Sequence, residues 1–173
     1  PETCDAPRKV RRTDSEGEQA MKLSMGSDER TAVSDAVIAE LRRRGHEVEL
    51  AGALAEGSAA EVVAWPVVAR HVAESVATGA ADEGVLFCWT GTGVSIAANK
   101  VPGIRAALCD DAETARGARL WNNANVLCLS LRRTSEVIAR EILDAWFSTR
   151  YRPNETDDAA LAALDAIEND YSE

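Results

Sequence analysis

This chain is poor in several residue types on which whole classes of function depend. Histidine occurs only twice in 173 residues, at His46 and His71, so a histidine-based metal site is not expected. Positive charge is scarce, because 19 Lys and Arg face 29 Asp and Glu for a net charge of −10. That balance argues against general affinity for nucleic acid or anionic membranes. No run approaches the roughly 18 apolar residues of a membrane span, and the first residues hold no apolar signal core.

The four cysteines show no spacing typical of metal ligands. Cys88, Cys109 and Cys128 lie in apolar runs typical of strands, and Cys4 lies in a polar amino-terminal stretch. This usage is typical of reduced thiols in the cytoplasm and not of a disulfide framework. We therefore expect a cytoplasmic protein with neither a metal ion nor structural disulfides.

Short apolar runs alternate with helical patterns along most of the chain. The runs typical of strands cover residues 21–25, 46–50, 84–88, 104–109 and 126–129. The helical patterns cover residues 31–44, 62–78, 94–100, 111–120 and 134–148. This alternation predicts one α/β domain over residues 21–150, with a five-stranded parallel sheet covered by helices on both faces. Residues 1–20 indicate a disordered extension, and residues 151–173 a terminal helix that packs on a neighbour or on the body.

Several conspicuous side chains have structural interpretations. His46 follows the helix stop at Gly45, so we expect it on the surface. Trp65 and Trp146 have apolar neighbours in helical segments, which predicts core or subunit-contact positions. Asp110 and Asp111, after the fourth expected strand, are expected to cap the following helix rather than to bind a ligand.

Residues 85–100, VLFCWTGTGVSIAANK, form the stretch best suited to a site. A strand ends at Cys88, a turn containing Gly91 and Gly93 follows, and a helix begins. The N–H groups of such a turn lie at the positive end of the helix dipole and suit a negatively charged oxygen. Cys88 beside the turn could carry a proton, although a cysteine there is also an ordinary small hydrophobe.

Ligands of open parallel sheets bind beyond the carboxyl ends of the strands. Asp28, Cys88, Asp110 and residues 122–125 are expected at or just after such ends. The sequence therefore predicts that these polar groups share one edge of the sheet.

Longer segments resemble the type-B ribose-5-phosphate isomerase and galactose-6-phosphate isomerase family. The resemblance runs over residues 21–149, through GSD at 26–28, RGHEV at 44–48, SIAANK at 95–100, VPGIRAALC at 101–109 and NNANVL at 122–127. It implies a Rossmann-like three-layer α/β/α sandwich, a homodimer or tetramer, and a site shared between two subunits. It also implies aldose–ketose interconversion through an enediolate, without a cofactor.

The resemblance further implies roles for individual residues. Cys88 would be the base that moves the proton between C1 and C2, with Thr90 beside it as a second catalytic residue. The N–H groups of residues 90–93 would hold the enediolate oxygen, and Asp28 and Asn122 would bind sugar hydroxyls. The expected substrate-binding residues are Asp28, Glu29, Trp89, Gly91, Thr92, Gly93, Trp121, Asn122 and Arg132.

The chain also departs from the family pattern within the expected site. Glu29 and Trp121 stand where the family has histidines, the latter being the ring-opening one, and Trp89 replaces a small glycine. We expect Trp89 or Trp121 to close off part of Cys88. The basic tail segment that grips phosphate in the family falls on residues 153–158, which read PNETDD here. Carboxylates at that place would repel a phosphate dianion.

Two functions are compatible with this divergent site. One is a sugar isomerase or epimerase that keeps the Cys88 machinery and acts on a substrate other than ribose 5-phosphate. The other is a family member that no longer catalyses and serves as a binding module or as one subunit of a mixed oligomer. Retention of Cys88, the glycine turn, Asp28 and Asn122 favours the enzyme. Loss of the ring-opening histidine favours the alternative, or a substrate that is already open-chain.

Overall fold

The computed structural model describes residues 19–57 and 64–171 of the chain. The extension expected over residues 1–20 therefore lies almost wholly outside the described residues, as do Cys4 and the expected start of the second helix at residues 62–63. Strands and helices alternate in the order β1 (Lys22–Ser27), α1 (Ala32–Arg43), β2 (Glu47–Gly52), α2 (Trp65–Ala77), β3 (Glu83–Cys88), α3 (Thr92–Ala98), β4 (Ala106–Leu108), α4 (Ala112–Asn122), β5 (Val126–Ser130), α5 (Glu136–Ser148) and α6 (Glu155–Asp170).

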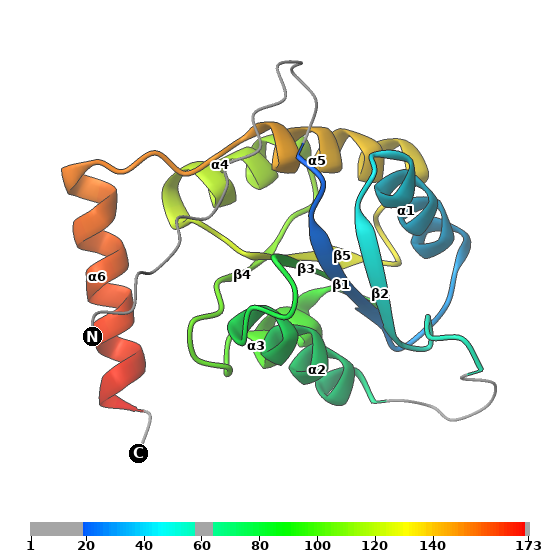
Figure 1. The fold of residues 1–173 in the computed structure, drawn as a ribbon, viewed down its shortest axis with the longest axis horizontal. Helices are drawn as coiled ribbons and strands as arrows, with labels where there is room; N and C mark the ends of the chain where they lie inside the picture. The colour runs from blue at the N-terminus through cyan, green and yellow to red at the C-terminus, as the bar shows by residue number, and fades with distance from the viewer. Residues whose placement is uncertain (1–18, 58–63, 172–173) are drawn as a thin grey trace, which may run out of the picture.

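The five strands form one parallel sheet in the order β2-β1-β3-β5-β4, as the alternation predicts. Helices α1, α4 and α5 cover one face, and α2 and α3 cover the other (Figure 1). The predicted three-layer α/β/α sandwich is therefore confirmed. Among the residues that the structure describes, no helix is both long and apolar enough to cross a bilayer.

The central strand β3 is buried on both faces, and its side chains alternate between two cores. Val85 and Phe87 belong to the cluster beneath α1, α4 and α5, whereas Leu86 and Cys88 belong to the cluster beneath α2 and α3. This follows from the two-residue period of a strand. The thiol of Cys88 is thereby directed toward the layer that contains α3.

The expectation that His46 lies on the surface is wrong. The residue is buried, with its ring centroid 4.7 Å from that of Phe147, and its Nδ1 accepts the Met21 N–H at 3.3 Å. Gly45, with a φ of 88°, turns the chain back from α1 into β2 and so directs His46 toward the end of α5. Local sequence marks the helix end but contains no information about the distant α5.

The two helical tryptophans differ in their exposure to solvent. Trp146 is fully buried and confirms the expected core position. Trp65 is 41% exposed, so it has no core position in the single chain, and its alternative position at a subunit contact stays a prediction. Asp111 caps α4 as predicted, because its side chain accepts the Thr114 N–H at 2.7 Å.

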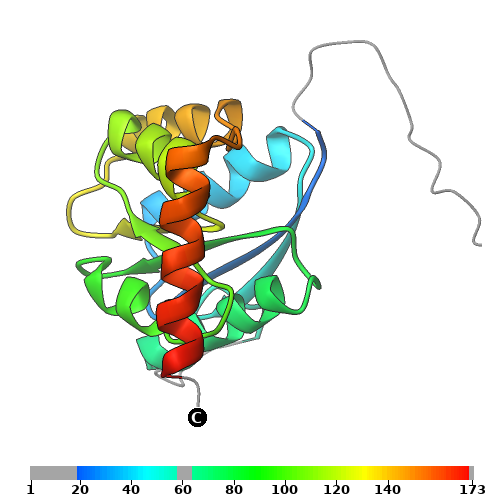
Figure 2. The ribbon, with the colours of Figure 1, turned by 90° about the vertical axis from the view of Figure 1, so that its left-hand side faces the viewer.

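The predicted terminal helix is present as α6, and it stands beside the sandwich with no buried residue (Figure 2). Asn154 caps its amino terminus, and Glu155, Asp157 and Asp158 occupy the first turn, where carboxylates complement the helix dipole. Glu168 accepts the Gly103 N–H at 3.0 Å and ties the helix to the body.

Candidate active site

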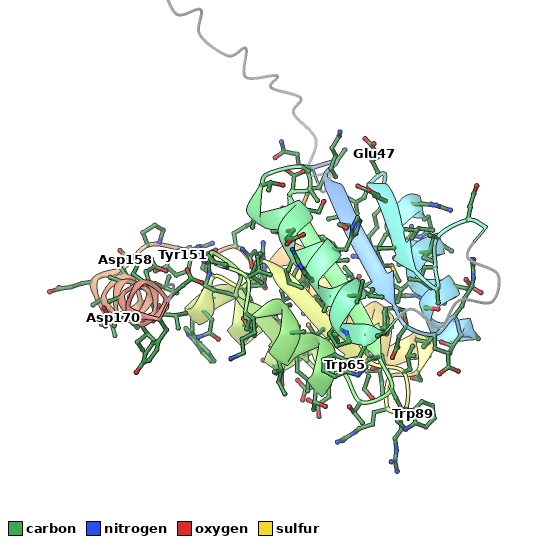
Figure 3. The ribbon with its side chains drawn as sticks, turned by 90° about the horizontal axis from the view of Figure 1, so that it is seen from below. Glu47, Trp65, Trp89, Tyr151, Asp158 and Asp170 are labelled. Carbon is green, nitrogen blue, oxygen red and sulfur yellow. The ribbon has the colours of Figure 1, made fainter. Side chains whose placement is uncertain are left out.

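The carboxyl-terminal edge of the sheet gathers most of the expected site residues. Ser27 pairs with Phe87 and Cys88 pairs with Ser130, so β1, β3 and β5 end side by side. Asp28, Cys88 and Arg132 therefore share this edge. Figure 3 shows Trp65 and Trp89 there, at the opposite end from Glu47, which begins β2.

Cys88 lies at the inner wall of this edge and is 5% exposed. The following turn closes over the strand end, because Gly91 adopts a φ of 76° and donates its N–H to the Cys88 carbonyl at 3.2 Å. The Gly91 N–H group already has a hydrogen-bond partner, so it does not fill its expected role as an oxyanion donor. Thr92 and Gly93 lie in the first turn of α3, whose N–H groups have no partner within the helix. They are the donors that could meet a developing negative charge.

A groove of about 640 Å³ opens beside the turn, lined by Thr90, Thr92, Leu108, Asp110, Ser130, Arg132 and Arg133. The Oγ1 atoms of Thr90 and Thr92 are 2.6 Å apart, and Arg133 approaches Asp110 at 3.7 Å. The lining offers hydroxyls, two guanidinium groups and a carboxylate, which suits a small polyhydroxylated ligand. No group of three His, Cys, Asp or Glu suited to a metal ion occurs among the described residues.

Asp28 brings an unsatisfied acceptor to this edge. Its Oδ1 is buried and has no hydrogen-bond partner among the described residues. Burial raises the pKa of Asp28 above its ordinary value, and the adjacent exposed Glu29 adds to this shift. A buried acceptor without a donor is costly for the folded chain. A sugar hydroxyl is the kind of donor that would satisfy it.

Asn122 and Trp121 do not join this edge within one chain, contrary to the expectation for residues 122–125. Asn122 is the last residue of α4, and the chain turns through Asn123, with a φ of 44°, into the start of β5. Since α4 returns the chain from the end of β4, these residues lie at the amino-terminal edge. The prediction treated residues 122–125 as following a strand, whereas they precede one.

Neither expected indole closes off Cys88 in the single chain, so that prediction is wrong for it. Trp89 is 57% exposed and Trp121 59% exposed, and Cys88 is instead buried in the apolar cluster that contains Val68 and Val94. The Trp89 carbonyl accepts the Arg132 N–H at 3.1 Å and the Ser130 hydroxyl at 2.9 Å. These bonds fasten the backbone to β5, and the ring projects outward (Figure 3).

Two neighbours of the site are not among the expected site residues. Trp65 packs on the turn, since a Cβ added at Gly93 would lie 3.1 Å from its ring atoms. Arg133 lines the groove beside Arg132. The sequence contains signals for both. Pro66 marks the start of α2, the helix that follows β2 in the chain, and the two arginines are adjacent in SLRR.

Known proteins are similar to this chain in sequence and in fold. The family model described as Ribose/Galactose Isomerase matches residues 23–164. The galactose-6-phosphate isomerase subunit LacB of Clostridium acetobutylicum is 42% identical over 107 residues, covering 61% of this chain and 62% of the relative. D-erythrulose-4-phosphate isomerase 2 of Mycolicibacterium smegmatis is 38% identical over 112 residues, covering 65% and 74%. The structure of Clostridium thermocellum ribose-5-phosphate isomerase B superposes with a TM-score of 0.80 at 36% identity, covering 87% of this chain and 99% of that one.

Proposed function

We propose, from the fact that the chain belongs to the ribose/galactose isomerase family, that it interconverts an aldose and a ketose through an enediolate. The observation that carries this proposal is the position of Cys88. Its side chain belongs to the core cluster beneath α2 and α3 and directly precedes the turn. It lies on the same edge of the sheet as the unsatisfied Oδ1 of Asp28. The proposed proton carrier, oxyanion donors and hydroxyl acceptor thus all lie at strand ends on one edge of the sheet.

The proposed reaction moves one proton between neighbouring carbons. The thiolate of Cys88 removes the proton alpha to the carbonyl, and negative charge develops on the carbonyl oxygen. The N–H groups of Thr92 and Gly93 would stabilise that charge, which is the dominant requirement for enolisation. The thiol then returns the proton to the adjacent carbon, so that the sugar is isomerised without a net gain or loss of protons. The hydroxyls of Thr90 and Thr92, whose oxygens are 2.6 Å apart, would move the proton between the two sugar oxygens.

We further propose that a second copy of the chain completes the site. Asn122 and Trp121 are exposed at the end of α4, and neither of them lines the groove beside the Cys88 turn. A homodimer would bring them to the site of the neighbour. The amide of Asn122 would then bind a sugar hydroxyl, while Asp28 binds another.

The proposed substrate differs from ribose 5-phosphate. Of the arginines near the site or the tail, Arg30 pairs with Asp35 at 2.8 Å, and Arg150 lies 3.7 Å from Glu83 at the amino-terminal edge. Arg132 and Arg133 remain in the groove, with Asp110 beside them. A phosphate dianion needs about two to four charge-assisted hydrogen bonds to offset its desolvation.

The acidic residues near the site oppose such an anion. The resemblance places residues 153–158 of a neighbour at the phosphate, and this segment carries carboxylates that α6 holds in its first turn. At an effective dielectric of about 20, one carboxylate some 4–5 Å from a phosphate costs about 3–4 kcal/mol per unit charge. That is a factor of several hundred in affinity. An unphosphorylated or less anionic sugar avoids this repulsion.

The test is proton exchange between sugar and deuterated water, followed by ¹H NMR. Ribose 5-phosphate, galactose 6-phosphate and erythrulose 4-phosphate would be compared with their unphosphorylated counterparts. We expect exchange to be fastest with an unphosphorylated sugar, to vanish in Cys88→Ala, and to survive in the control Cys109→Ala, a buried thiol on the other core face.

Two outcomes contradict the proposal. Turnover of ribose 5-phosphate that Cys88→Ala abolishes would overturn the proposed substrate. A lack of exchange with every sugar would favour the non-catalytic alternative, a binding module or one subunit of a mixed oligomer.

A further inference from the structure

A buried polar cluster joins α4 to β3 and α5, away from the carboxyl-terminal edge. Arg119, which is 7% exposed, donates from Nη2 to Oε1 of Glu83 at 2.6 Å. Trp146 donates from Nε1 to the other oxygen of the same carboxylate at 2.6 Å, and the Arg119 guanidinium lies 4.9 Å from the Trp146 ring centroid. Both oxygens of Glu83 and one arm of Arg119 are therefore satisfied inside the protein.

The other arm of Arg119 leads to the turn that follows Asn122. Its Nη1 donates to the Ala124 carbonyl. Arg105 approaches the same turn from the β4 side, because its Nε donates to the Asn123 carbonyl at 2.8 Å. Two guanidinium groups thus hold successive carbonyls of the segment directly after Asn122.

We propose that Arg119 is a positioning residue, which holds this turn so that Asn122 meets the substrate in the site of a second copy. The inference rests on the proposed function. The Asn122 side chain is exposed and makes no hydrogen bond with the described residues, so its position depends on the backbone of the turn. One arm of Arg119 holds that turn through the Ala124 carbonyl, two residues after Asn122, while Glu83 fixes the other arm.

Stability alone does not account for an ion pair at this place. Replacing a buried pair by well-packed apolar side chains is often neutral or stabilising, because both charges lose their hydration when buried. A guanidinium does what an apolar side chain cannot, since its rigid fork fixes the direction of two acceptors at once. Reaction rates are sensitive to such precision, because a misplacement of about 1 Å can cost roughly a hundredfold.

A double-mutant cycle tests whether Arg119 acts through Asn122. Arg119→Lys keeps the positive charge beside Glu83 and loses the fork. With the sugar that the wild-type protein turns over, we expect this change to lower kcat/KM by about 10- to 100-fold. In an Asn122→Ala background the same change should cost less than about threefold, because the positioned group is already gone. An equal loss in both backgrounds would show a general structural role and overturn the inference.

Arg116→Lys is the matched control. Arg116 lies on the same helix, is half exposed and pairs with Glu113 at 3.3 Å. We expect this variant to stay within about twofold of the wild-type kcat/KM, since exposed pairs contribute little.

Hydrogen exchange of the backbone supplies a readout that needs no turnover. The Ala124 N–H donates to the Ala118 carbonyl at 3.0 Å and the Asn125 N–H to the Arg105 carbonyl at 3.1 Å. Arg119→Lys should speed exchange at these amides about tenfold or more, with α1 and the Arg116→Lys control unchanged. Unchanged exchange in Arg119→Lys would overturn the positioning role whether or not any sugar is turned over.

The two proposals can fail separately. The expected exchange pattern without turnover in any variant would count against the proposed function and leave the held turn in place. If Arg119→Lys does not fold, Arg105→Lys removes the second donor to the turn and carries the same two expectations.

Discussion

At the scale of single residues, the candidate site contains groups that destabilise the folded chain. Asp28 keeps a buried oxygen without a partner among the described residues, and its pKa is raised by burial. Such strain is typical of positions kept for binding, because the same group that weakens the empty protein recognises the ligand. Replacing Asp28 should therefore raise the stability of the protein while lowering its activity.

Asp28→Asn should stabilise the protein by about 1 kcal/mol near pH 7 while lowering its kcat/KM. A raised folded-state pKa means that Asp28 contributes most stability when protonated, below the ordinary value of 3.8, and loses it as pH rises. The advantage of the variant should thus grow as pH rises from about 3 to 7, as measured by urea unfolding.

Asp165→Asn, an exposed change on α6, is the control and should show no such trend. A variant of Asp28 that is less stable than the wild-type protein at every pH would contradict the argument.

Gly91 is a second position in the site, and its backbone conformation and close neighbours leave no room for a larger residue. Its φ is 76°, and an added Cβ would lie 2.5 Å from Leu108 Cδ1 and 3.0 Å from the Leu129 carbonyl. Gly91→Ala should therefore lower the free energy of unfolding by about 2–4 kcal/mol, from the left-handed backbone and the clash together.

Gly103→Ala isolates the backbone part of that effect. Gly103 has a similar φ of 79°, but an added Cβ would meet nothing within 4 Å. We expect a loss of only about 1–2 kcal/mol from this variant. Equal losses in the two variants by urea unfolding would show that the close approach at Gly91 does not matter.

At the scale of elements, ion pairs fasten helices whose own sequences are only moderately amphipathic. Glu40 on α1 bonds Arg43 at 2.7 Å and Arg44 at 2.8 Å, and Arg44 also pairs with Asp144 on α5. The Arg43 and Arg44 guanidinium groups lower the pKa of Glu40 to about 2. This network secures the helical layer that carries α4 and its terminal turn.

Glu40→Gln should reduce stability by about 1 kcal/mol near neutral pH, after allowance for solvent screening. Because the folded-state pKa is depressed, the stabilisation is present above the ordinary value of 4.5 and is lost as pH falls toward about 2. The difference between variant and wild-type proteins should shrink over that range in urea titrations.

The control at this scale is Glu74→Gln, which breaks the exposed pair with Arg70 on α2. We expect a change below about 0.5 kcal/mol. A constant effect of Glu40→Gln down to the lowest pH would show that charge is not its cause.

At the scale of the whole molecule, α6 is the element that the single chain leaves unfinished. It extends beside both helical layers without a buried residue, and Leu164 and Ile167 are 45% and 57% exposed (Figure 2). Most helical stability in proteins comes from the packing of one face on a neighbour, so packing on another surface should stabilise α6. The proposed homodimer supplies such a surface.

The double variant Leu164→Asp with Ile167→Asp should shift the protein toward monomer in sedimentation velocity, and turnover should fall with dissociation because Asn122 is proposed to act in the neighbour. Ala162→Asp with Ala166→Asp adds the same charge on the opposite side of α6 and should leave assembly intact. A monomeric wild-type protein would contradict this prediction and the shared site together.

The sequence by itself determined which segments are strands and which are helices. Each pattern is local, since the apolar run that ends at Cys88 or the helix stop at Gly45 can be recognised from neighbouring residues. Asp28 and Cys88 could be placed on one edge because both directly follow or end strands of a parallel sheet.

Tertiary structure decided what depends on distant partners. The burial of His46 depends on Phe147, about a hundred residues away, and the exposure of Trp89 depends on bonds to β5. Asn122 ends a helix and precedes a strand, so it lies at the amino-terminal edge of the sheet. The short segment around it does not reveal that placement. Side-chain surroundings are set by the packing of elements remote in sequence, and local periodicity contains no record of them.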